Sequence, residues 1–449
     1  MMKKVIFSFL LLSSSTLDIN AQSKDSVQIV DGRNSYVKTC IFPESTATII
    51  FVPYDYFTPC KKAIVELYAK GSSNSNGIPS SFSNAFVNPK FIDNELKSKA
   101  YDRLNGMGRF GLELDFGVEA VVSPDSTWYQ SEQALTFSAG RQLVYGAEFS
   151  EDLLRTVFSG NAAYADQTAN FDNSKLYAIG YQYFKIGYRK HLTKNKLGFF
   201  TNFGFARGLN HTDIQLNSGS LYTEPSGQWL DLAWNGSYFT STRSSNRLGE
   251  SPSNGYLMDL GFYKFLDQKY QWKLSASLKD LGFITWNAQS DNFKRDTSFR
   301  FTGLQFYDVL NYDDTTLVVG DSLLNRLRGA EEKASEMKLL PFQLQAELRY
   351  LADPKTGRLL LTAGARYRRI PGMRIEYSLR GNYRLINTKP LYLNLGFTYG
   401  GFGNLNSNVG LEYKPNRHRI QIGTMYNEGF LSSKSLSGNG IYFSYMILL

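Results

Sequence analysis

The chain has 449 residues, including 32 Phe, 29 Tyr and 38 Gly, and its formal net charge is +9. After the N-terminus no run approaches the 18 or more apolar residues of a membrane-spanning helix, so a helical membrane protein is excluded. A basic balance often indicates nucleic-acid binding, but these arginines alternate along predicted strands and do not cluster on a helix. The composition therefore argues against a nucleic-acid partner.

Residues 1–21 have the features of a secretory signal peptide. Lys3 and Lys4 precede the apolar run Val5–Leu12, and the polar stretch that follows ends at Ala21. We predict cleavage after Ala21, and no cysteine lies near that site to indicate a lipoprotein. The two cysteines, at positions 40 and 60, would then lie in an oxidising compartment, where a disulfide between Cys40 and Cys60 is one option. Spacing alone does not show that their Cα atoms come close enough to pair.

Residues 22–100 give a weaker pattern. Thr46–Tyr54 and Ala63–Tyr68 resemble short strands, and Gly71–Ser83 is a connector rich in Ser, Asn and Gly. We interpret residues 22–100 as an N-terminal periplasmic extension or plug. The alternative is that this segment adds a strand to the domain that follows.

Residues 101–449 are dominated by strands, and the pattern is clearest in Pro341–Leu385. Three runs there place an apolar residue at every second position, as in Phe342, Leu344, Ala346, Leu348 and Tyr350. Each run has about 11 residues, the length that crosses a bilayer when tilted, whereas strands of a soluble sandwich average nearer 5 or 6. We predict an all-β fold, a transmembrane antiparallel β-barrel.

Counting strand-like runs after residue 101 gives fifteen. They are Gly108–Val122, Ala134–Val144, Leu176–His191, Leu197–Gly208, Thr212–Thr223, Trp229–Thr240, Gly255–Leu266, Tyr270–Leu281, the three runs of Pro341–Leu385, Leu391–Gly400, Leu405–Lys414, Arg419–Asn427 and Gly440–Leu449. Since single-chain bacterial barrels have an even number of strands, we expect 14, or 16. Two loops also predict short helices, one beginning at Ser150-Glu151-Asp152 and one over Asp321–Met337.

Charged residues occupy the other face of the three runs in Pro341–Leu385, which we predict to line the barrel lumen. These candidates are Glu347, Arg349, Arg366, Arg368, Arg374, Glu376, Arg380 and Arg384. Guanidinium–carboxylate pairs of this kind fill barrel interiors and lock neighbouring strands. The alternative is that the local excess of Arg over Glu favours an anionic solute.

The sequence offers little for catalysis. Its three histidines, His191, His211 and His418, fall at predicted turns on both sides of the membrane and do not converge as metal ligands would. No nucleophile motif or phosphate-binding loop is present. We predict no enzymatic activity, no cofactor and no metal. The one enzyme hypothesis left is a site on the outer rim at His211, with Asp213 close by in sequence.

Several motifs resemble a known family over about four fifths of the chain. They are Asn88-Pro89, Leu153-Leu154 leading to Ser159-Gly160-Asn161, Tyr177–Arg189, Gly198–Leu209, Asp231-Leu232 running into Gly236-Ser237-Tyr238, Asn254-Gly255 through Asp259-Leu260-Gly261 to Ser275–Trp286, and Leu340-Pro341. The chain resembles a family of Bacteroidota outer-membrane barrels that is filed as a domain of unknown function and is distantly similar to FadL-like and PorV/PorP-like proteins. The resemblance implies an outer-membrane location and no catalytic signature.

These observations lead to one expected function and one alternative. We expect a non-enzymatic passive channel for a small or amphipathic solute in a bacterial outer membrane, with membrane lipid around it. The alternative is a non-transporting scaffold that docks a secretion or surface protein.

Overall fold

The computed structural model describes residues 63–449 except 88–90, 105, 123–132, 243–252, 288–289, 303–331, 334, 353–357, 387–388, 416 and 435. The predicted signal peptide, residues 22–62 and the Cys40–Cys60 pair lie outside the described residues. Within the described ranges, no helix is both long enough and apolar enough to cross a membrane.

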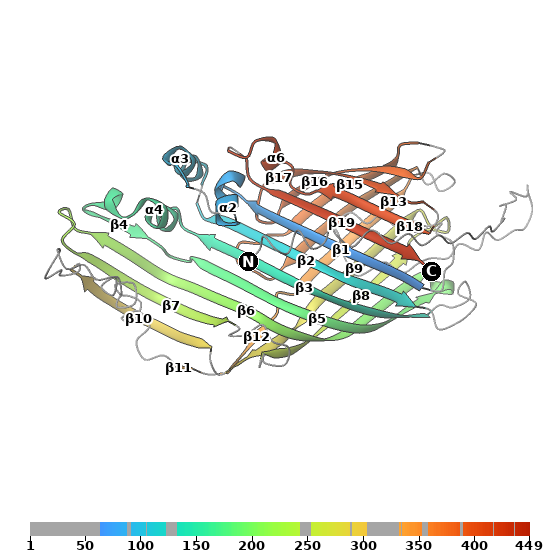
Figure 1. The fold of residues 1–449 in the computed structure, drawn as a ribbon, viewed down its shortest axis with the longest axis horizontal. Helices are drawn as coiled ribbons and strands as arrows, with labels where there is room; N and C mark the ends of the chain where they lie inside the picture. Colours follow the sequence, from blue (N-terminus) through green and yellow to red (C-terminus); the bar gives the residue numbers. More distant parts are fainter. Residues whose placement is uncertain are drawn as a thin grey trace, which may run out of the picture. The chain divides into compact units, whose positions relative to one another are not determined.

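Fourteen antiparallel strands of the described chain close into a barrel (Figure 1). In order around the wall they are β1 (Ala63–Ser75), β2 (Gly108–Val122), β3 (Gln133–Phe149), β5 (Lys175–Leu192), β6 (Leu197–Thr223), β8 (Asn254–Phe265), β9 (Trp272–Trp286), β13 (Gln343–Leu351), β14 (Leu359–Arg368), β15 (Glu376–Arg384), β16 (Leu391–Gly400), β17 (Leu405–Tyr413), β18 (His418–Thr424) and β19 (Asn439–Leu448). The first and last strands pair, from Ile64 opposite Leu448 to Ser73 opposite Asn439. The predicted fold class is confirmed, with 14 strands.

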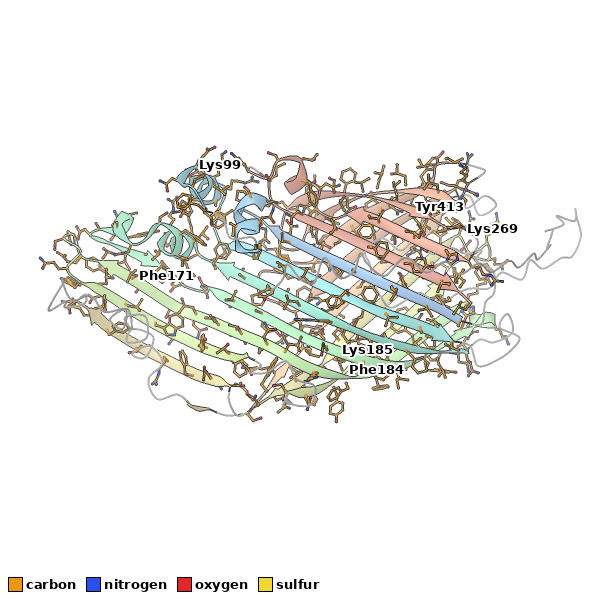
Figure 2. The ribbon with its side chains drawn as sticks, in the orientation of Figure 1. Lys99, Phe171, Phe184, Lys185, Lys269 and Tyr413 are labelled. Atoms are coloured by element: carbon orange, nitrogen blue, oxygen red, sulfur yellow. The ribbon has the colours of Figure 1, made fainter. Side chains whose placement is uncertain are left out.

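The alternating pattern of each strand separates two environments. On β5, Phe184 is 49% exposed, whereas the next residue, Lys185, is 6% exposed and lies on the inner face (Figure 2). On β13 the exposed Leu344 and Leu348 alternate with the buried Gln343 and Glu347. Since ionised groups on a lipid-facing wall cost about 2–4 kcal/mol each at mid-depth, this arrangement places the leucines against lipid and the charges in the lumen.

Aromatic rings mark both ends of the lipid-facing wall. Trp272 of β9 stacks on Tyr350 of β13, with ring centroids 4.4 Å apart, at the end of the barrel with the short turns. At the opposite end, Phe205 of β6 and Tyr256 of β8 are exposed and contact each other edge to face. Aromatic side chains at both ends of the wall are typical of the interfaces of a bilayer.

Over residues 63–75 the structure differs from our interpretation as an extension or plug and agrees with the alternative, an added strand. Ala63–Ser75 is barrel strand β1, hydrogen-bonded to β2 on one side and to β19 on the other. The sequence of its second half, Gly71–Ser75, resembles a connector because it lacks apolar residues. It is a strand because its neighbours satisfy its polar groups: Ser73 Oγ donates to Asn439 Oδ1 (2.7 Å) and Ser75 Oγ to the Arg109 carbonyl (2.6 Å).

The predicted turn near residue 210 was wrong. Leu197–Gly208 and Thr212–Thr223 form one 27-residue strand, β6, which pairs with β8 through Arg207 and with β7 (Leu230–Thr242) from Asn210 onward. Strand β10 (Asp291–Phe301) continues the sheet beyond β7, and β4 (Gln167–Asn170) pairs with the far end of β6. We call β4, residues 210–223, β7 and β10 the wing; it extends past the barrel wall (Figure 1).

Two short strands complete the sheet. β11 (Glu332–Lys333) pairs with the start of β10, and β12 (Glu336–Leu339) pairs with β9 above β13. The predicted helix over Asp321–Met337 is therefore wrong where it is described, because pairing with β9 and β10 outweighs the helical spacing of its leucines. Residues 321–331 and 334 lie outside the described part of the chain.

The described α-helices gather at the barrel end with the long loops. They are α2 (Ser80–Val87), α3 (Asn94–Arg103), α4 (Glu151–Ser159) and α6 (Glu428–Leu431), and a short 3-10 turn at Ala162–Tyr164 follows α4. A second 3-10 turn, Thr193–Asn195, lies at the other end of the barrel, in the short connection between β5 and β6. The predicted start of α4 is confirmed, since Ser150 Oγ accepts from the Leu153 amide at 3.1 Å. Phe82 of α2 and Leu154 of α4 pack in one apolar cluster with Phe149 of β3.

Candidate functional site: the barrel interior

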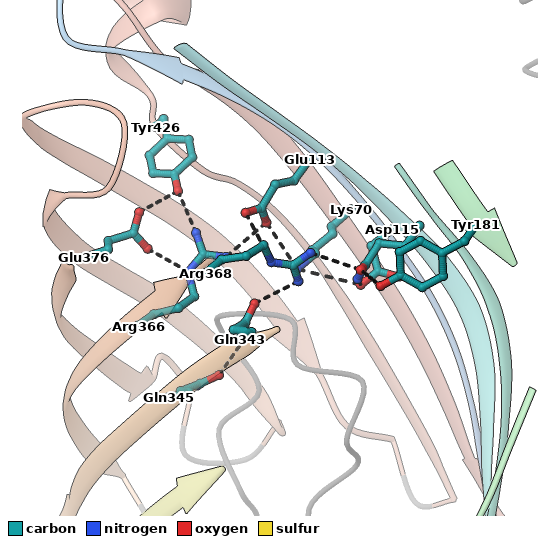
Figure 3. A network of polar contacts seen from close by, with 11 residues as sticks. Lys70, Glu113, Asp115, Tyr181, Gln343, Gln345, Arg366, Arg368, Glu376 and Tyr426 are labelled. Atoms are coloured by element: carbon teal, nitrogen blue, oxygen red, sulfur yellow. Dashed lines mark hydrogen bonds and ion pairs between the residues drawn. The ribbon is translucent and has the colours of Figure 1, made fainter. Parts of the chain in front are cut away.

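The side chain of Arg366 on β14 reaches across the lumen and contacts another part of the barrel wall. We call a buried side chain that does this a crossbar. Arg366 Nη1 lies 3.1 Å from Glu113 Oε2 on β2, a strand on the opposite side of the barrel. Its Nε donates to Glu376 Oε1 on neighbouring β15 at 3.2 Å, and Tyr426 OH donates to the other oxygen of Glu376 at 2.8 Å (Figure 3). One guanidinium therefore links three parts of the wall.

Arg368 forms a second crossbar two residues along β14. Its Nη1 donates to Gln142 Oε1 on β3 and its Nη2 to Gln343 Oε1 on β13, both at 3.0 Å. Gln142 in turn donates to Asp115 Oδ2 on β2 at 3.3 Å, and Lys70 of β1 lies 3.8 Å from the same oxygen (Figure 3). Both crossbars are buried, so their charges are balanced by other protein groups and not by bulk water.

A third cluster surrounds Lys185 of β5. Its Nζ lies 2.9 Å from both oxygens of Asp259 on β8 and 2.8 Å from Asp280 Oδ1 on β9. The two aspartates meet because the β8–β9 register shifts between Met258 and Leu260, which is a β-bulge. Asp280 has a φ of 56°, and its amide donates to Asp259 Oδ1 at 2.9 Å.

The remaining predicted lumen residues divide into two groups. Glu347 accepts hydrogen bonds from Arg349 Nη2 at 2.6 Å and from Arg380, and all three side chains are largely shielded from solvent. Arg374 is exposed and precedes β15, and Arg384 lies at the short-turn end, with its Nε 3.5 Å from the Lys389 carbonyl. The last two residues are thus separate from the buried clusters.

Sequence reasoning missed the acidic partners of several buried lysines and arginines. Glu113, Asp115, Asp259 and Asp280 come from strands far from β14 in the sequence. On β2, alternation along the strand could have identified two of them as inward-facing, because Glu113 and Asp115 alternate with the apolar Leu112, Leu114 and Phe116. Glu113 offsets part of the local excess of Arg that the C-terminal strands show when considered alone, and the three aspartates pair with Lys70 and Lys185.

A small cavity lies between the buried clusters. It is polar, has a volume of about 40 Å³ and lies among Lys70, Asp115, Lys185, Asp280 and Arg368. A buried water occupies at least 10–15 Å³ by the same measure, so the cavity holds a few waters. Ion pairs and hydrogen bonds therefore surround a space that holds only a few waters.

An apolar layer lies next to the crossbars, toward the long-loop end. It comprises Val144, Tyr177, Ile179, Tyr181, Ala206, Phe239, Leu257, Ile284, Trp286, Leu340, Ile370, Met373 and Phe402. Two hairpin turns fold inward to form it. A Cβ added at Gly146 of β3 would lie 2.6 Å from the Pro371 carbonyl, and one at Gly111 of β2 would lie 2.0 Å from the Phe402 ring. Glycine at these two positions permits the turns to reach strands that are not their neighbours in the sheet.

His211 does not form the rim site that we considered. It lies within β6 and is fully buried, its Nδ1 is 3.0 Å from the Ala178 carbonyl, and its ring stacks on Trp286. Asp213 instead accepts from Gln215 Nε2 at 3.2 Å. Throughout the described residues, no group of three or more His, Cys, Asp or Glu side chains is arranged to hold a metal ion.

A family model described as a family of unknown function (DUF5723) matches residues 63–425. The chain belongs to the DUF5723 family. This confirms the predicted membership of a family of unknown function, and the Bacteroidota lineage stays a prediction. No curated protein matches the DUF5723 chain.

Three solved structures are similar to the DUF5723 chain. The toluene transporter TodX of P. putida is 12% identical, with a TM-score of 0.41, covering 88% of this chain and 91% of that one. The translocator domain of the autotransporter NalP from Neisseria meningitidis is 9% identical, with a TM-score of 0.33 and coverage of 87% and 89%. The CymD monoaromatic hydrocarbon channel is 11% identical, with a TM-score of 0.33 and coverage of 86% and 88%.

Proposed function

We propose that the protein is a bacterial outer-membrane barrel that admits a small amphipathic solute through a gated lumen and catalyses no reaction. The proposal rests on the order of two layers inside the barrel, one apolar and one of ion pairs. An apolar layer at the long-loop end, with Trp286, Met373 and Phe402, adjoins a layer of ion pairs around Arg366 and Arg368. An amphipathic solute has an apolar body and a polar head, so it would meet matching surroundings in each layer.

Gating is part of the proposal because both layers are packed. The apolar layer depends on two turns, and turns rearrange more readily than paired strands. Passage would require the hairpins at Ile370–Met373 and at Phe402 to swing away from Gly146 and Gly111. The crossbar of Arg368 would then exchange its two glutamine partners for water.

Conductance in a planar bilayer tests this function. We expect the full-length mature protein to be closed for most of the recording, with brief openings. Met373→Ser/Phe402→Ser should lengthen the openings, because it removes apolar contacts that hold both turns inward. Ile375→Ser is the matched control, since Ile375 is in the same hairpin region but is exposed on the outer face. Recordings in which the double variant stays as silent as the wild type would contradict gating by the turns.

The wing supports a second candidate, a scaffold that docks a secretion or surface protein. β10 is the outermost long strand of the wing, and β11 pairs with it at Asp291 and Asn292. A strand at the edge of a sheet can serve as a template for an added strand. A stoichiometric partner that co-purifies with the wild type and is lost when residues 293–301 become a Gly-Ser segment would favour this candidate over transport.

A further inference from the structure

The lipid-facing wall contains a groove in addition to the lumen. Its volume is about 700 Å³, and it crosses five strands, β6, β8, β9, β13 and β14. This volume is in the range of small-molecule sites, about 300–1,000 Å³. It lies outside the barrel, because the exposed side chains that line it, such as Leu260, Phe262 and Leu344, belong to the outward-facing set.

The register explains the depth of the groove. Ala276, Ala346 and Ala365 are direct cross-strand neighbours on β9, β13 and β14. Phe262 continues this row on β8 and Tyr377 on β15, so large rings stand at both ends of three short side chains. Leu278, Leu344 and Tyr367 form the next row and give the groove a side wall.

A cation stands at one end of the groove. Lys264 is two residues beyond Phe262 on the same outward face of β8, next to the short-turn end of the barrel, and it is exposed. Its cross-strand neighbours are Leu197 and Leu274, so neither offers a counter-charge to the ammonium group. A lysine stem can lie along the apolar wall while its head reaches the membrane interface, where lipid phosphates lie.

We propose that this groove binds one membrane phospholipid, with an acyl chain over Ala276, Ala346 and Ala365 and the phosphate on Lys264. The three alanines form the floor of the groove, and their short side chains leave room for a thin, flexible acyl chain. The flat wall of a second barrel would contact the surrounding rings and leucines and leave the floor empty. We expect the lipid to come from the periplasmic leaflet, since Lys264 lies at the short-turn end. The proposal is independent of transport through the lumen.

Native mass spectrometry of the full-length protein, titrated with phosphatidylglycerol, tests the acyl-chain site. We expect the wild type to retain one lipid more tightly than the rest. Ala346→Phe and, separately, Ala276→Phe should abolish that tight binding by filling the floor from two different strands. Ala69→Phe is the control, because Ala69 is an exposed outward-facing alanine of β1 far from the groove. Folded variants that keep the tight lipid would overturn the proposal.

The headgroup assignment has its own measurement. Lys264→Gln should weaken phosphatidylglycerol binding about fivefold, since one basic residue near the membrane surface contributes about 1 kcal/mol. It should leave binding of diacylglycerol, which lacks the phosphate, unchanged. Arg141→Gln is the control, because Arg141 is an exposed outward-facing cation on β3. Equal effects on both lipids would overturn the role of Lys264.

Photolabelling of the wild-type protein does not depend on any variant. Phosphatidylglycerol with a diazirine in its acyl chain should label residues 274–278 and 344–346 above all other lipid-facing segments. Labelling spread evenly around the barrel would mean that only ordinary boundary lipid is present, which contradicts the proposal.

Discussion

Arg366→Met is expected to lower the free energy of unfolding by about 3–5 kcal/mol. The substitution removes the guanidinium that pairs with Glu113 and Glu376 but leaves both carboxylates buried. Glu113 keeps Lys70 at 3.9 Å, whereas Glu376 keeps only the hydroxyl of Tyr426 among the partners described above. Most of the loss should therefore arise from Glu376. Urea unfolding in lipid vesicles, followed by the heat-modifiable gel shift of the barrel, measures it.

Two further variants are the controls for Arg366→Met, one a rescue and the other a change at an exposed ion pair. Arg366→Met/Glu376→Gln should recover part of the lost stability, because it removes the unpaired charge. Arg300→Met on the wing should change stability little, although Arg300 Nε also pairs with a carboxylate at 2.8 Å, because that pair is about half exposed. The Arg300 hydrogen bond does lower the pKa of Asp231, but water screens both groups. Similar losses for Arg366→Met and Arg300→Met would show that burial of the crossbar is not decisive.

Lys185→Met is expected to destabilise the barrel by at least as much, about 3–5 kcal/mol or more. In the wild type, the buried carboxylates of Asp259 and Asp280 share the ammonium group of Lys185, and the substitution leaves both carboxylates without it. Asp259 retains donors from Asn202 Nδ2 at 3.1 Å and from the Asp280 amide at 2.9 Å. The carboxylate of Asp280 would lose the ammonium group that holds it.

Lys185→Met/Asp280→Asn is the matching rescue. Asparagine tolerates the positive φ of residue 280, so the second change removes a charge without straining the bulge. We expect the double variant to be more stable than Lys185→Met in the same vesicle unfolding assay. A double variant no more stable than Lys185→Met would mean that repulsion between the two carboxylates is not the cause of the loss.

The barrel was predictable from the sequence because its main determinant is local. A lipid-facing strand must alternate, and Leu344 and Leu348 against Gln343 and Glu347 show this within a single strand. The first half of β1 was predicted as a strand, and its place in the barrel was the alternative interpretation. Its second half was interpreted as a connector, because the wall needs apolar residues only where lipid touches it and Gly71–Ser75 carries small polar residues. The 27-residue β6 was divided in two because Asn210 and His211 resemble turn residues, whereas β5 and β7 hold them in the sheet.

The interior was predictable only in part, because its pairing is not local. The alternation of residues along β14 identified Arg366 and Arg368 as inward-facing. Alternation could not identify Glu113 as the partner of Arg366, because that contact depends on which strands face each other across a closed barrel. The inward turns at Ile370–Met373 and Phe402 were also missed, since glycines at 111 and 146 are informative only once the opposing loops are known.

The pairing of β1 with β19 also constrains how the molecule is made. The two strands that seal the cylinder lie at opposite ends of the described chain, from Ala63 to Leu448. Until the final ten-residue strand arrives, β1 and β18 each present a row of unpaired amide and carbonyl groups that a hydrocarbon environment does not tolerate. Membrane insertion must therefore wait for the last strand or be helped by a machine that shields both edges, and a chain truncated before Asn439 would remain an open, insertion-incompetent sheet.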